Sequence, residues 1–102
     1  MSYFIMFSRH TAESCPMNNG KTRQMALEAV SALPEAAKKF GITVVGSWSI
    51  TPEHLVVHVF DAVNLDTLLS FSMEPSLLKW WSFNTSEIKP ATTLEEAVRL
   101  IR

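Results

Sequence analysis

Apolar residues along this chain follow a strand-like pattern first and a helical pattern next. Ser2 to His10 opens with the run Tyr-Phe-Ile-Met-Phe and then turns polar, which is typical of a central strand covered on both faces. From Lys21 to Phe40 apolar residues recur at helical spacing, after Asn18-Asn19 as an N-cap and before Gly41 as a left-handed terminator. Pro34 lies inside this stretch, so we expect the helix to kink there or to restart with Pro34 in its first turn.

The middle of the chain has the composition of a β-hairpin. Ile42 to Ile50 and His54 to Phe60 are rich in β-branched and aromatic residues. Thr51-Pro52-Glu53 between them supplies a short connection. We therefore predict two antiparallel strands joined by a tight turn.

The last third of the chain predicts two helical segments, a strand and a closing helix. A helix is expected from Asn64 to about Phe71, and Glu74-Pro75 starts one further turn. Trp81 to Lys89 alternates as a fourth strand that Pro90 ends. Thr93-Leu94-Glu95-Glu96 is a capping box, so a short helix should follow it.

The predicted order of elements is β-α-β-β-α-β with an added C-terminal helix, which defines an α+β fold of the ferredoxin-like kind. We expect one domain over residues 1–102, an antiparallel sheet in the order four-one-three-two, and helices on one face. In the third strand Leu55, Val57 and Val59 should face the helices. The residues expected on the open face are His54, Val56, His58 and Phe60. An open apolar face indicates that a second copy covers it.

Composition narrows the classes of function. The chain is 47% hydrophobic and 19% charged, which is typical of a globular protein. A net charge of -1 argues against binding of nucleic acid through its phosphates. No apolar run approaches the length that crosses a bilayer, and we expect no membrane association. The one cysteine, Cys15, cannot form an internal disulfide, which favours a reducing, cytoplasmic location.

Polar residues far apart in sequence should converge at one end of this sheet. The first strand ends at His10, and its expected neighbour, the third strand, begins near His54. The loop after the first strand and the segment before the fourth strand leave from the same end. The residues expected at this rim are His10, Glu13, Cys15, His54, Trp80 and Trp81.

Three kinds of chemistry fit this rim. His10, Cys15 and His54 supply two imidazoles and a thiolate for Zn, Ni, Cu or Fe, with Glu13 as a fourth or outer ligand. Alternatively, Cys15 is a reactive thiol near the start of a helix. As a third hypothesis, His54 or His58 performs acid–base catalysis in an aromatic-lined cavity without a cofactor.

For each of these hypotheses a simpler structural role is the alternative, and whether the protein is an enzyme stays open. His10 and His54 would then bond loop backbone, and Cys15 would pack as a small apolar residue. The tryptophans would form core and interface. His58 lies about 13 Å along the strand from His54, too far for both to bind one ion, and pairing across a dimer is the alternative.

Three short motifs suggest a family. The loop His10 to Pro16 reads His-x-x-Glu-x-Cys-Pro, the hairpin carries Pro52-Glu53-His54, and the last helix begins Thr92-Thr93-Leu94-Glu95-Glu96-Ala97. Over essentially its whole length the chain resembles an uncharacterised family of the dimeric α/β-barrel superfamily. The resemblance implies a homodimer with two sheets face to face and a cavity on the open face near the partner.

The resemblance does not choose an activity, because that superfamily includes cofactor-free monooxygenases, small isomerases, haem-handling proteins and metal-binding proteins. Our preferred hypothesis is a homodimer that binds a metal ion or small ligand at the rim, with Trp80 and Trp81 against a ligand. One alternative is a cofactor-free isomerase or monooxygenase with a cavity histidine as general base. The other is a structural or partner-binding module without chemistry.

Overall fold

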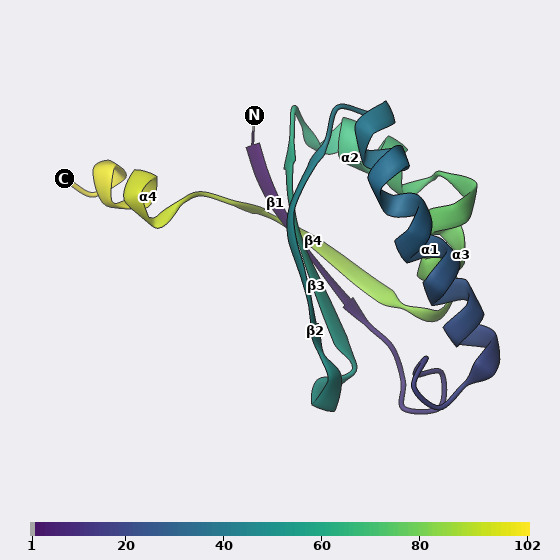
Figure 1. The fold of residues 1–102 in the computed structure, drawn as a ribbon. Helices are drawn as coiled ribbons and strands as arrows, with labels where there is room; N and C mark the ends of the chain where they lie inside the picture. Colours follow the sequence, from purple (N-terminus) through teal and green to yellow (C-terminus); the bar gives the residue numbers. More distant parts are fainter. Residues whose placement is uncertain (1) are drawn as a thin grey trace.

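The protein has two layers, a four-stranded antiparallel sheet and helices that cover one of its faces (Figure 1). This computed structural model describes residues 2–102. The strands are β1 (Ser2–Arg9), β2 (Thr43–Ile50), β3 (Leu55–Ala62) and β4 (Thr85–Ala91). The helices are α1 (Gly20–Lys39), α2 (Leu65–Ser72), α3 (Pro75–Phe83) and α4 (Leu94–Leu100), with a 3₁₀ turn, η1, at Thr51–Glu53. The order of strands is β2-β3-β1-β4, so the fold class is α+β.

Helix α1 begins and ends at the residues that the sequence indicates. The Asn19 side chain accepts hydrogen bonds from the backbone N–H groups of Lys21 and Thr22 at its N-terminus. Beyond its C-terminus Gly41 adopts a φ of 66°, which suits glycine. The helix runs through Pro34 and does not restart there. Its buried residues lie on both sides of Pro34, so packing against the sheet holds both halves in one element.

The predicted hairpin is confirmed, with η1 as its connection, but the fourth strand begins later than the sequence predicts. Trp81 lies in α3, which runs to Phe83, and β4 begins only at Thr85. The helical conformation lets Leu77 and Trp80, three residues apart, bury their side chains on one face. Pro90 lies inside β4 rather than after it, which an edge strand tolerates because one row of its N–H groups has no partner in the sheet.

The two faces of β3 are the reverse of the expected ones. Phe60 and Ala62 are buried in the core with residues of α1, α2 and α3, and Val56 packs against the same cluster. His58 is two residues from both Val56 and Phe60, so its side chain points to the same face of the strand. Its ring centroid lies 6.3 Å from that of Trp80 in α3. Val57 therefore belongs to the open face. The prediction failed because it took histidine as a mark of the exposed face, whereas a hydrogen bond with Ser47 pairs His58 Nδ1 inside an apolar layer.

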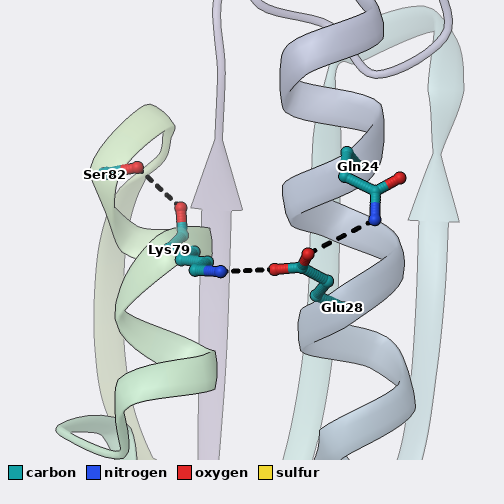
Figure 2. Close-up of polar contacts among 4 residues, drawn as sticks. All are labelled: Gln24, Glu28, Lys79 and Ser82. Carbon is teal, nitrogen blue, oxygen red and sulfur yellow. Dashed lines mark hydrogen bonds and ion pairs between the residues drawn. The ribbon is translucent and has the colours of Figure 1, made fainter.

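An ion pair links helices α1 and α3 at the surface of the helical layer. Lys79 of α3 approaches the Glu28 carboxylate of α1 at 2.6 Å, and Gln24 donates a second hydrogen bond to that carboxylate (Figure 2). The hydrogen bond from Lys79 is the main cause that lowers the pKa of Glu28. Because both partners are exposed to solvent, the pair adds little to stability.

Helix α4 stands apart from both layers. It follows an extended segment after β4 and points away from the sheet (Figure 1). None of its residues is buried, and Leu94, Leu100 and Ile101 are each at least 80% exposed. Thr93 caps it by accepting from the backbone N–H of Glu96, as the capping box predicts. In the described part of the chain, no helix has the length and apolar character needed to cross a membrane.

Candidate metal centre

The antiparallel pairing of β1 with β3 brings His10 and His54 together. The register runs from Ser2 opposite Ala62 to Arg9 opposite Leu55. His10, which follows β1, therefore lies opposite His54, which precedes β3. The backbone N–H of His10 donates to the carbonyl oxygen of His54 at 3.1 Å. Their rings meet edge to face with centroids 5.4 Å apart. The convergence of these histidines is thus built into the sheet.

Cys15 reaches the same place on a loop held by its own backbone. The Cys15 carbonyl oxygen accepts hydrogen bonds from the N–H groups of Asn18 and Asn19, at 2.9 and 3.0 Å. Arg23 in α1 donates from its guanidinium to the carbonyl oxygens of the two residues that follow Cys15. Cys15 is 3% exposed. The loop therefore presents the thiol inward in a fixed geometry.

The three residues form one group of ligand atoms. One ring nitrogen of His10, one ring nitrogen of His54 and the sulfur of Cys15 all lie within 4.8 Å of one another. In a tetrahedral zinc site with the usual bond lengths such atoms are roughly 3.3 to 3.6 Å apart. Side-chain rotations that close the group by about 1 Å would bring all three to bonding distance of one ion.

Asn84 fixes the orientation of the His10 ring. Its amide nitrogen donates to the carbonyl oxygen of Trp80 at 2.8 Å, which directs the amide oxygen toward His10 Nδ1 at 3.2 Å. His10 then carries its proton on Nδ1, an assignment that follows from this network. Nε2 keeps its lone pair, is buried, and bonds to no other group in residues 2–102. A metal-binding histidine is ordinarily held in this way by an outer acceptor.

His54 combines an unusual backbone with a second unpaired nitrogen. It ends η1 in the left-handed conformation, with φ 52° and ψ 42°, and its N–H donates to Thr51 O. For a residue with a side chain this conformation costs about 1–2 kcal/mol. Its Nδ1 is buried and has no hydrogen-bond partner among the residues that the structure describes. Backbone strain and an unsatisfied nitrogen at one residue are typical of a functional position.

A small cavity adjoins the three side chains. Its volume is about 100 Å³, which is ample for an ion and a bound water molecule. The other lining residues are Pro16, Met17, Ser49, Thr51, Val56 and Trp80. An ion held by these three residues would have free space beside it for a further ligand.

The remaining sequence candidates lie elsewhere. Glu13 is exposed and is not part of this group, so the expected fourth ligand is not found in that position. His58 forms a hydrogen bond with Ser47 at 2.7 Å, away from the other two histidines. Trp80 lines both the small cavity and a second, larger one, and Trp81 lines the larger one.

Asn84 is the residue that sequence reasoning missed. The alternation from Trp81 to Lys89 predicts that Asn84 lies inside a strand. In the structure it lies between the end of α3 and the start of β4. The available signal was an asparagine four residues after a buried tryptophan, where an amide side chain can satisfy the last carbonyl groups of a helix. Ser47, the partner of His58, is likewise hidden until the register of β2 with β3 is known.

Comparison with known proteins supports the fold only. No family model matches the chain, and no curated protein matches it. Among solved structures, it is similar to the crystal structure of protein Atu4242 from Agrobacterium tumefaciens, a structural genomics target. The identity is 19% and the TM-score 0.55, over 90% of this chain and 92% of the other. The molecule is therefore one of the small α+β proteins with an antiparallel sheet, and this likeness assigns no activity.

Proposed function

We propose that this protein binds a transition-metal ion through His10, Cys15 and His54, with a fourth position open to water or a small ligand. The observation that carries the proposal is the group of three ligand atoms within 4.8 Å of one another, two of them on histidines with buried, unpaired nitrogens. Unsatisfied buried nitrogens are costly, and coordination of an ion removes that cost.

The donor set selects a class of metal. Two imidazoles and a thiolate suit Zn²⁺, Ni²⁺, Cu or Fe, whereas Ca²⁺ and Mg²⁺ prefer oxygen ligands. Binding requires the Cys15 thiolate, so metal affinity should fall as pH falls. With three protein ligands and an adjoining cavity, the ion would keep one position for an exchangeable ligand, as catalytic zinc sites do.

The assembly that we propose is a homodimer of ferredoxin-like units, with its sheets face to face as in the dimeric α/β-barrel superfamily. The strand order, read from β4 as β4-β1-β3-β2, supports the ferredoxin-like arrangement. The open face carries Trp48 and Ile50, both at least 40% exposed, beside Val57. The apolar residues of α4 are uncovered as well. A second copy would cover both surfaces at once, and a cytoplasmic location would keep Cys15 reduced.

The test of the metal proposal compares metal content between matched variants. Protein without an affinity tag is reconstituted with Zn²⁺, Ni²⁺ or Cu²⁺, dialysed, and analysed for bound metal. We expect about one ion per chain in the native protein and loss of it in His54→Asn, because asparagine tolerates the left-handed backbone but lacks the imidazole. His58→Gln is the matched control and should retain the ion. A native protein that holds none of these ions after reconstitution would contradict the proposal.

A further inference from the structure

A second, larger cavity lies between the sheet and the helices α1 and α3. Its volume is about 250 Å³. Most of the side chains that line it are aliphatic or aromatic, and the largest are Trp48, Phe60, Phe71, Trp80 and Trp81. Val30 of α1 also lines it and is 61% exposed, which places the opening beside that helix. We refer to this cavity as the helix-side chamber.

The size of the chamber restricts its occupant. Cavities of about 150 Å³ lined by apolar residues bind benzene, and sites for drug-sized molecules begin near 300 Å³. The chamber lies between these sizes. A molecule of one or two fused rings matches it, whereas a nucleotide or a peptide does not.

The lining also restricts the charge of the occupant. Within the described residues, no Asp, Glu, Lys or Arg lines the chamber. Burial lowers the pKa of the His58 imidazole, so this ring is neutral at physiological pH. The indole N–H groups of Trp80 and Trp81 already donate to Ser8 Oγ and to the Ser72 carbonyl oxygen. A charged ligand would lose its hydration without finding a counter-charge.

His58 offers a polar position for a ligand, beside the hydroxyl groups of Ser47 and Ser49 that also line the chamber. His58 Nδ1 is 2.7 Å from Ser47 Oγ, which fixes the ring. Among the hydrogen bonds of the described residues, that of His58 with Ser47 involves Nδ1, and Nε2 has no partner. If Nδ1 donates to Ser47, Nε2 is a hydrogen-bond acceptor, and if Nδ1 accepts from Ser47, Nε2 is a donor. A hydroxyl group satisfies either state.

We propose that the helix-side chamber binds a neutral, largely apolar organic molecule of one or two fused rings, whose single hydroxyl-like group bonds to His58 Nε2. The site is distinct from the metal centre and does not depend on it. The two cavities nevertheless share Ser49, Val56 and Trp80 as a common wall. A ligand in the chamber therefore lies one side chain away from the metal-binding residues.

The experiment uses three matched probes, 2-naphthol, naphthalene and 2-naphthoate, titrated into ¹⁵N-labelled protein of residues 1–102. The indole N–H signals of the three tryptophans report on the site, because Trp48, Trp80 and Trp81 all line the chamber. We expect 2-naphthol to shift the signals of Trp80 and Trp81 saturably and to bind about 3- to 10-fold tighter than naphthalene, the ratio given by one net hydrogen bond. Binding of 2-naphthoate should be weaker than that of 2-naphthol by more than about 10-fold.

Three variants distinguish binding in the chamber from binding elsewhere on the protein. His58→Phe keeps the shape of the ring and should bind naphthalene while losing the preference for 2-naphthol. Val30→Trp, at the exposed opening, should block all probes without disturbing the core. Cys15→Ser should bind 2-naphthol as the native protein does, so that loss of the metal centre does not affect this result. Thermal melts confirm that each variant is folded.

Three outcomes would overturn the proposal. The first is that no probe shifts the Trp80 and Trp81 signals in the native protein. The second is that 2-naphthoate binds as tightly as 2-naphthol. The third is that folded His58→Phe keeps the full preference for the hydroxyl group.

Discussion

The backbone N–H of His10 donates to the backbone carbonyl oxygen of His54 at 3.1 Å, and this bond continues the β1–β3 ladder by one residue. Two proposed metal ligands that are 44 positions apart in sequence are thus joined by main-chain atoms. Because the link does not involve side chains, each imidazole can be replaced while the other stays in place. The backbone that positions the two residues is therefore independent of the side-chain atoms that would bind the ion.

The first prediction concerns Asn84, which orients His10. Asn84→Ala removes the acceptor of the His10 Nδ1 proton and frees the ring to rotate. We expect the affinity for the bound metal to fall by about 10- to 100-fold, which is usual when an outer partner of a ligand is removed. Competition with a chromogenic chelator measures the change.

Asn84→Asp serves as the control for this prediction. The aspartate retains an acceptor for His10 but loses the amide donor to the carbonyl oxygen of Trp80. We expect it to restore most of the metal affinity. Equal losses in the alanine and aspartate variants would show that Asn84 acts through the end of α3 rather than through His10.

The second prediction concerns pH and His58. Burial lowers the pKa of this ring in the folded state from its ordinary value of 6.5, so the unfolded chain takes up a proton at a pH where the folded chain does not. The free energy of unfolding should therefore decrease as pH falls below 6.5 toward the lowered pKa of the folded state, and should be unaffected above 6.5. Chemical denaturation at pH 8 down to about pH 5 tests this.

The control for the pH prediction is His58→Gln, which does not titrate. Its stability should vary less with pH over the same range. The metal centre lies beyond a wall that includes Val56 and Trp80. Both proteins are measured metal-free in the Cys15→Ser background, so that every other titratable group is common to the two curves, and parallel curves would contradict the prediction.

The third prediction concerns the open face of the sheet. Val57→Lys places a charge in the middle of the surface that we assign to the second copy. We expect the dimer to dissociate, because a buried, unpaired charge is costly. Sedimentation or light scattering measures the mass, with Leu27→Lys on the exposed side of α1 as the control that should remain dimeric.

The fourth prediction concerns the core beneath α2. Leu68 is fully buried, whereas its neighbour Leu69 is 44% exposed. We expect Leu68→Ala to reduce the free energy of unfolding by about 2–5 kcal/mol through lost burial and a residual cavity. Leu69→Ala should cost much less, and equal losses in urea denaturation would mean that α2 is rotated relative to the sheet.

Much of the candidate site followed from the sequence. The convergence of His10 and His54 required only that the first and third strands pair, and the predicted order of elements was sufficient to predict that pairing. Cys15 joined them because its loop leaves from the same strand end.

Two features did not follow from the sequence. The facing of β3 was reversed because a histidine satisfied by Ser47 is compatible with an apolar layer, and that bond exists only once β2 is in register. The end of α3 was missed because an aromatic run is compatible with a strand as well as with a helix. Burial of Trp80 against the sheet decides between them, and burial is a tertiary property.

The left-handed backbone of His54 also has a consequence for how this position varies among sequences. The turn needs a residue that tolerates a φ of 52°, whatever its side chain does. In a homologue that no longer binds metal, the constraint on chemistry would disappear while the constraint on geometry remained. Such homologues should carry glycine, asparagine or aspartate here and should avoid valine and isoleucine. In an alignment of homologues, glycine, asparagine or aspartate at this position would indicate loss of the metal-binding imidazole with the turn kept, whereas valine or isoleucine would indicate loss of the turn itself.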